Sequence, residues 1–129
     1  MISTSLNKYQ QSSVQTASPI QLTLMLYDGA IRFIKLGIEG IENRDYEKAN
    51  LNLIKAQRIV NEFIASLNFD YPIAKDLLAV YDYAIYKLIQ ANLKKDKNNA
   101  IEVLHHLMEL KEAWLKASKQ PSSEKASHE

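Results

Sequence analysis

The stretch SPIQLTLMLYDGAIRFIKLGIEGIENRD, residues 18–45, decides the fold class of this chain. Ser18 and Pro19 predict a helix start, because serine caps helices and proline loses no hydrogen bond at the first helical position. Apolar residues then recur at alternating spacings of four and three, the pattern of a helix packed in a bundle. This apolar face consists of Ile20, Leu24, Tyr27, Ile31, Ile34, Ile38 and Ile41. Residues 43–45 break the pattern and predict the end of the helix.

The same spacing recurs in three further segments. Asp45 is the expected N-cap of a second helix, Pro72 begins a third, and residues 94–96 form the last turn. The expected core residues are Tyr46, Ala49, Leu53, Ala56, Val60, Phe63 and Leu67, then Ile73, Leu77, Val80 or Tyr81, Ala84, Leu88 and Ala91, then Val103, Leu107, Leu110, Trp114 and Ala117. Four helices joined by short connections predict an all-α fold, an antiparallel up-down four-helix bundle over residues 18–118.

The two ends of the chain differ from the helical part in composition. Residues 1–17 contain too few apolar residues for a core element, although Leu6, Tyr9 and Val14 are spaced to dock on apolar surface elsewhere. Residues 119–129 are rich in Ser, Lys and Glu, which predicts a disordered tail. The polar start of the chain lacks the cationic and apolar regions of a signal peptide.

The predicted helices carry more apolar surface than one bundle core needs. The extra residues on the first helix include Leu22, Leu26, Gly29, Phe33 and Leu36, and all three glycines of the chain, Gly29, Gly37 and Gly40, lie on this stripe. On the later helices the extra residues are Leu78, Ile85, Ile89, Ile101, Leu104, Met108 and Leu115. Large apolar patches usually mark partner sites, so these residues are candidates for an apolar groove that binds a polypeptide segment. The glycines are equally consistent with helix–helix contact inside the bundle.

Charge and composition argue against several classes of protein. The net charge is +1, from 16 basic and 15 acidic residues that are interspersed, which disfavours nucleic-acid binding and attraction to anionic membranes. Two pairs, Asp28 with Arg32 and Lys35 with Glu39, are spaced for ion pairs along the first helix. No apolar run is long enough to span a bilayer. The absence of cysteine excludes disulfides and zinc–thiolate sites and fits a reducing compartment.

No catalytic motif is present in the sequence. Glu102 and His105 have the Glu-x-x-His spacing of di-iron bundles, but no second such motif or further inward carboxylates accompany them. We therefore expect both to lie on a solvated face with His106 and Glu109. We expect no metal, no cofactor and no enzymatic activity.

Several blocks of this sequence resemble the FliS family of flagellar export chaperones specific for flagellin. The most specific blocks are Tyr9, Val14-Gln15-Thr16-Ala17-Ser18-Pro19 and Leu24-Met25-Leu26-Tyr27-Asp28-Gly29-Ala30. Weaker blocks are Lys55-Ala56-Gln57-Arg58-Ile59-Val60, Val80-Tyr81-Asp82-Tyr83, Ala91-Asn92 and Glu112-Ala113-Trp114. Together they extend from about Tyr9 to Ala117, nearly the whole helical part.

The resemblance implies a bundle with an N-terminal cap and a function in the cytoplasm. The cap segment would comprise residues 1–17. The implied cap residues are Leu6, Tyr9, Val14, Thr16 and Ala17, together with Ser18 and Pro19 at the junction with the first helix. The implied partner is the C-terminal region of flagellin, bound 1:1 by a mostly monomeric chaperone that prevents premature polymerisation. A component of the flagellar export gate is a further implied partner. The alternative hypothesis is a homo-oligomeric helical scaffold or adaptor without a chaperone role.

Overall fold

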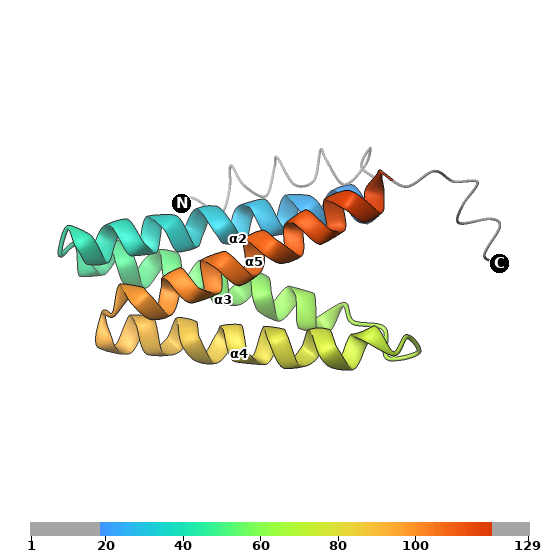
Figure 1. Ribbon diagram of the computed structural model, residues 1–129. Coiled ribbons are helices and arrows are strands. Elements are labelled where there is room, and N and C mark those ends of the chain that lie inside the picture. The colour runs from blue at the N-terminus through green and yellow to red at the C-terminus, as the bar shows by residue number, and fades with distance from the viewer. Residues whose placement is uncertain (1–18, 120–129) are drawn as a thin grey trace.

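The computed structural model describes residues 19–119, where the chain forms four helices in an antiparallel arrangement (Figure 1). The helices are α2 (Pro19–Glu42), α3 (Tyr46–Ala65), α4 (Ile73–Lys94) and α5 (Lys97–Ser118). Each packs against the next along the chain, and α5 returns to pack against α2. The predicted all-α up-down bundle is confirmed. The predicted cap segment, the predicted N-cap Ser18 and the predicted tail beyond Lys119 lie outside the described residues, whereas Pro19 is the first residue of α2.

Aspartate side chains cap the N-termini of two helices. The Asp45 carboxylate accepts a hydrogen bond from the backbone N–H of Lys48 at 3.2 Å, as predicted for the start of α3. The Asp96 carboxylate accepts one from the N–H of Asn98 at 2.9 Å and so caps α5. The residues just before these caps, Arg44 and Lys95, have positive φ angles of 56° and 49°. Both tight turns are thus made without glycine. For this reason the capping residues predicted where the helices begin, and glycine did not.

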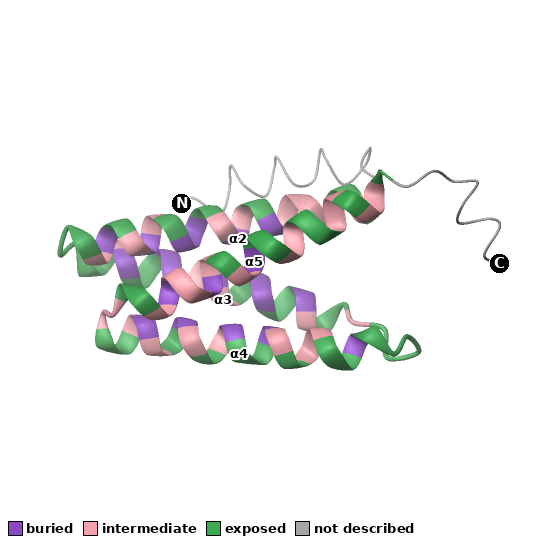
Figure 2. Ribbon diagram, viewed as in Figure 1, coloured by how far each residue is buried: buried purple, intermediate pink, exposed green. Residues whose placement is uncertain are grey.

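About half of the predicted core residues are buried, and these lie on the sides of the helices that face one another (Figure 2). The buried ones are Tyr27, Ile34, Ala49, Leu53, Ala56, Val60, Phe63, Tyr81, Ala84, Leu88, Ala91, Val103 and Leu107. The prediction that Tyr46 and Ile73 belong to the core was wrong. They are the first residues of α3 and α4 and are 47% and 61% exposed. Helix ends extend past the neighbouring helices, so apolar periodicity overestimates burial there.

The buried face of α2 is turned towards α3 relative to the prediction. Phe33, Gly37 and Gly40 are buried, whereas Ile31 and Ile38 are only half-buried. The glycines explain the difference, because a helix surface without side chains lets a neighbouring helix approach closely. A Cβ atom on Gly37 would lie 2.7 Å from Leu53 Cδ2, and one on Gly40 would lie 2.7 Å from the backbone nitrogen of Ala49.

A cluster of four aromatic residues joins all four helices at the centre of the bundle. The ring of Tyr27 stacks on Phe63, with centroids 4.4 Å apart, and Phe63 stacks on Tyr81 at 5.3 Å. The hydroxyl groups of Tyr27 and Tyr81 are hydrogen-bonded at 2.6 Å. The indole N–H of Trp114 donates to the Tyr27 hydroxyl at 3.2 Å. We call Tyr27, Phe63, Tyr81 and Trp114 the aromatic cluster.

Burial favours the neutral form of both tyrosines of the aromatic cluster. The pKa of Tyr27 is raised chiefly by desolvation, although its hydrogen bonds to Tyr81 and Trp114 oppose the rise. The pKa of Tyr81 is raised by desolvation and further by its hydrogen bond to Tyr27. The hydroxyls therefore act as hydrogen-bonding groups that fix how the helices face one another, because each is satisfied only when its partner helix is in place.

Gly40→Ala is expected to destabilise the fold, although alanine favours a helix over glycine by about 1 kcal/mol. The new Cβ would lie 2.7 Å from the nitrogen of Ala49 and 2.9 Å from the carbonyl oxygen of Asp45, and backbone atoms cannot easily move aside. The free energy of unfolding in urea should fall by about 1–3 kcal/mol. Gly29→Ala is the matched control, because its new Cβ would meet only the flexible Cδ1 of Ile59, at 3.3 Å. Equal effects of the two substitutions would contradict this account.

Tyr27→Phe removes one hydroxyl and leaves two partner groups unsatisfied, the Tyr81 hydroxyl and the Trp114 N–H. The free energy of unfolding should fall by about 1–3 kcal/mol, the usual effect of an unpaired buried polar group. Tyr86→Phe is the control, since Tyr86 is 58% exposed, and should change stability by less than about 0.5 kcal/mol. The double variant Tyr27→Phe/Tyr81→Phe should lose less than the sum of the single changes. A Tyr27 variant as stable as the control would show that these hydrogen bonds do not hold the bundle.

Candidate functional site

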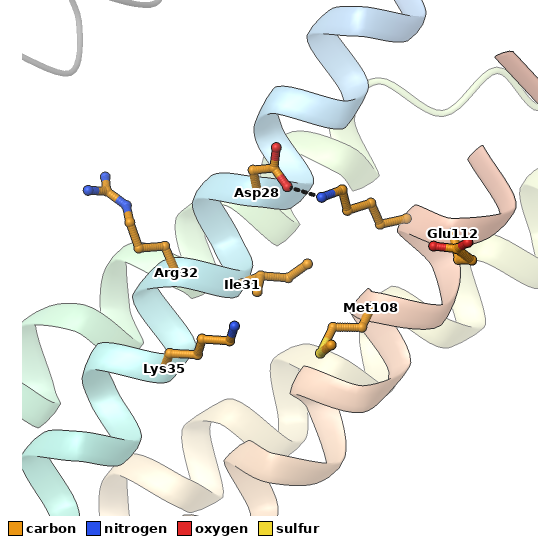
Figure 3. A pocket seen from close by; sticks show the side chains of 7 residues that line it. Asp28, Ile31, Arg32, Lys35, Met108 and Glu112 are labelled. Atoms are coloured by element: carbon orange, nitrogen blue, oxygen red, sulfur yellow. Dashed lines mark ion pairs between the residues drawn. The ribbon is translucent and has the colours of Figure 1, made fainter. Parts of the chain in front are cut away.

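The bundle has four faces, each formed by two adjacent helices, and the predicted apolar stripes lie on three of them. The stripe on α5 lies on the α2/α5 face. There Met108 of α5 and Ile31 of α2 line a hollow of about 410 Å³ and point across it towards each other (Figure 3). Leu104 and Ile101 precede Met108 by one and two helical turns, so they lie on the same face. Met108 is 45% exposed, and the other two are half-buried.

Charged residues surround the hollow on the α2/α5 face. Asp28 of α2 forms an ion pair with Lys111 of α5 across it, and Glu112 stands nearby (Figure 3). The amine of Lys35 is turned towards the hollow, while Arg32 points away from it. The face is therefore apolar at its floor and charged at its rim.

The stripe on α4 lies on the α3/α4 face. The side chain of Asn92 donates a hydrogen bond to Asn50 of α3 at 2.8 Å, which marks the side of α4 next to α3. Ile89 and Ile85 precede Asn92 by three and seven residues, and Leu78 precedes it by fourteen, so they share this side. Ile89 is 38% exposed, and the other two are half-buried.

The stripe on α2 lies on the α2/α3 face, because Gly29 is opposite Ile59 and Gly37 is opposite Leu53. Of the two explanations for the glycines, helix–helix contact accounts for the buried Gly37 and Gly40. Gly29 is half-buried, meets only the end of the Ile59 side chain, and stays a candidate for guest contact. Phe33 was wrongly placed in an accessible groove, since it is 1% exposed and belongs to the core. The reason is again the close approach of α3. Leu22, Leu26 and Leu36 remain half-buried along this face.

The α4/α5 face is different because a polar cluster crosses it. The Tyr83 hydroxyl donates to the Glu102 carboxylate, and the amine of Lys87 lies 3.3 Å from the same carboxylate. These contacts lower the pKa of Glu102, with the hydrogen bond from Tyr83 as the main cause. A hollow of about 420 Å³ lies beside this cluster and is lined by Ala79, Val80, Tyr83, His106, Glu109 and Leu110. Glu102 was predicted only to be solvated, because side-chain contacts between helices cannot be predicted from periodicity.

Ion pairs along α2 also differ from the prediction. Asp28 pairs with Lys111 of α5 rather than with Arg32, and Glu39 pairs with Lys48 of α3 rather than with Lys35. Carboxylates on a packed helix can bind cations of neighbouring helices as readily as those one turn away. The α2 carboxylates therefore form ion pairs with other helices. Both cations of α2, Arg32 and Lys35, have no carboxylate partner within residues 19–119.

Residues 19–119 offer neither a metal site nor a membrane span. This part of the chain contains no group of three or more His, Cys, Asp or Glu residues placed to hold a metal ion. None of its helices is long and apolar enough to cross a membrane. What remains is a helical bundle with apolar residues on three adjacent faces, the kind of surface on which proteins bind polypeptide segments.

Comparison with known proteins identifies the family. The sequence model described as "Flagellar protein FliS" matches residues 2–121, and the chain belongs to this family of flagellar secretion chaperones. The Flagellar secretion chaperone FliS of Bacillus subtilis (strain 168) is 45% identical over 109 residues, covering 84% of this chain and 82% of the relative. The protein of the same name from Salmonella typhimurium is 36% identical over 115 residues, covering 87% and 85%. The predicted resemblance is confirmed.

A solved structure has the same fold. The "Crystal structure of flagellar chaperone from bacteria" superposes with a TM-score of 0.74 and covers 92% of this chain and 98% of its own. Its sequence identity is 19%, so the likeness supports the all-α bundle and no finer conclusion.

Proposed function

We propose that this protein is a cytoplasmic export chaperone that binds the C-terminal segment of flagellin and prevents its premature polymerisation. The observation that carries the proposal is the distribution of apolar residues over three adjacent faces, with Met108 45% and Ile89 38% exposed. A single groove would suit one short helix. The α2/α5, α2/α3 and α3/α4 faces instead adjoin one another around the bundle. Together they suit a long unfolded segment that wraps around it.

The proposed contact residues are those of the three stripes that the fold leaves half-buried or exposed. They are Leu22, Leu26, Gly29, Leu36, Leu78, Ile85, Ile89, Ile101, Leu104 and Met108. The α4/α5 face is left out of the proposed contact, because the polar cluster of Tyr83, Lys87 and Glu102 crosses it beside its hollow.

Binding of this kind needs no catalysis and no cofactor. The guest segment becomes ordered as it binds, which costs about 2–5 kcal/mol and is offset by burial of about 1,000–3,000 Å². Burial of apolar surface on both partners should give a negative heat-capacity change. Release would follow from competition by a component of the flagellar export gate.

Residues 1–17 are proposed to act as a cap that covers part of the apolar surface when no guest is bound. A tethered segment can cover a site with low intrinsic affinity because its effective concentration is high. The alternative, a homo-oligomeric scaffold, would use the same stripes for contact between copies.

Met108→Lys tests the proposed function directly. A lysine at this 45% exposed position can extend into solvent in the free protein, but in the complex its charge would be buried against the guest. Isothermal titration with a flagellin C-terminal segment should show 1:1 binding by the unchanged protein and at least about tenfold weaker binding by the variant. Tyr86→Lys is the control, because Tyr86 is 58% exposed on the outer side of α4.

The same samples distinguish the two hypotheses. The unchanged protein should sediment as a monomer at all concentrations and should delay the seeded polymerisation of flagellin at equimolar amounts. Self-association that Met108→Lys abolishes, together with no binding of the flagellin segment, would support the scaffold and refute the chaperone.

A further inference from the structure

Three cations on the α2/α3 face have no carboxylate partner within residues 19–119. They are Arg32 of α2 and Lys55 and Arg58 of α3. All four ion pairs of the described residues involve other cations. The amine of Lys55 is moreover buried and has no hydrogen-bond partner among the described residues. A buried ammonium without a partner is rare in folded proteins, because burial removes its hydration without replacement.

Two of the three cations lie over one aromatic ring. The guanidinium carbon of Arg32 lies 5.1 Å from the centroid of the Phe33 ring, and the amine of Lys55 lies 5.6 Å from the same centroid. Burial lowers the pKa of Lys55, and the charges of Arg32 and Arg58 lower it further. The ring attracts each cation, but the cations repel one another. The arrangement therefore lacks a negative charge.

Neither of the α2 carboxylates nearest to Arg32 along the helix supplies that charge. Asp28 pairs with Lys111 on the α2/α5 face, and Glu39 pairs with Lys48. On α3, Glu62 stands one turn beyond Arg58 and forms no ion pair with it. The three cations thus have no ion-pair partner within residues 19–119, while the α2 carboxylates pair with other cations.

The ends of the chain offer few other carboxylates. The first 27 residues contain no aspartate or glutamate, so a cap formed by residues 1–17 cannot neutralise the site. Beyond residue 119 the only acidic residues are Glu124 and Glu129. The missing charge is therefore best supplied by a partner that lies along the α2/α3 face.

We propose that Arg32, Lys55 and Arg58 form a carboxylate-binding site for an acidic side chain of the guest polypeptide. The inference rests on the proposed function, because it takes the α2/α3 face as part of the guest contact. An aspartate or glutamate of the guest would accept hydrogen bonds from the Lys55 amine and from one or both guanidinium groups. Its apolar neighbours would lie on Leu22 and Leu36, so the site fixes which part of the guest binds this face.

Lys55→Met is the decisive substitution, because it keeps the apolar stem and removes the buried, unpaired charge. The variant should melt at the same or a higher temperature than the unchanged protein, yet bind the flagellin C-terminal segment about tenfold more weakly. Lys75→Met removes one charge from an exposed position near the start of α4 and should leave binding unaltered. Arg58→Gln, at an exposed site where folding is not at risk, should weaken binding about two- to fivefold.

The guest side of the contact is tested by changing each acidic residue of the segment to its amide. One such change should weaken binding to the unchanged protein and have no effect on Lys55→Met, which identifies the bound carboxylate. Equal affinities of the unchanged protein, Lys55→Met and Arg58→Gln would overturn the site while leaving the proposed function intact. No binding by the unchanged protein would overturn the proposed function and this site with it.

The tail of the chain is the remaining source of a carboxylate. Glu124→Gln/Glu129→Gln should bind the guest as the unchanged protein does, and Lys55→Met should weaken binding equally in its presence. If the tail substitutions instead abolish the effect of Lys55→Met, the carboxylate comes from this chain and the proposal is wrong.

Discussion

The hydroxyl of Tyr27 is the point on which the arrangement of the four helices depends. It bonds to Tyr81 of α4 and accepts from Trp114 of α5, while the ring that carries it stacks on Phe63 of α3. A slide or rotation of any one helix would leave a buried polar group without its partner. Apolar contacts alone would tolerate several registers, but this cluster favours one.

The close contact of α2 and α3 adds a second constraint. Gly37 and Gly40 face Leu53 and Ala49 so closely that no side chain fits between the helices at that end of the bundle. The aromatic cluster, further along, requires more space between them. Together, small residues at one end and large rings at the centre set the angles at which the helices spread from one another (Figure 1).

The position of each apolar stripe follows from that register. Once Tyr27, Tyr81 and Trp114 face the centre, the residues on their flanks are fixed on particular faces. Met108 must then lie next to α2, and Ile89 next to α3. The polar cluster of Tyr83 and Glu102 occupies the α4/α5 face. The bundle thus has apolar stripes on three faces and a polar cluster beside the hollow on the fourth, which is the basis for a guest that wraps around it.

Periodicity and caps were sufficient to predict the four helices, because each has a long apolar face and Asp45 marks a start that the backbone confirms. The candidate stripes were also visible in the sequence as apolar residues in excess of one core. Their distribution over three faces of the bundle could not be predicted, since the periodicity of one helix does not show which neighbouring helix each of its sides contacts. Phe33 was misassigned for the same reason. Lys55 belonged to a block of family resemblance, but its lack of a partner depends on Asp28 and Glu39 pairing across helices.

The most direct test of a wrapped guest is a footprint with single cysteines, because the chain contains none of its own. Met108→Cys, Ile89→Cys and Leu22→Cys place one thiol on each apolar face, and Tyr86→Cys places one on the outer side of α4. The rate of thiol labelling is measured for each variant with and without a flagellin C-terminal segment. The account predicts that the guest slows labelling at the three apolar faces and leaves Tyr86→Cys unchanged. Protection at only one face, or equal protection at all four positions, would contradict it.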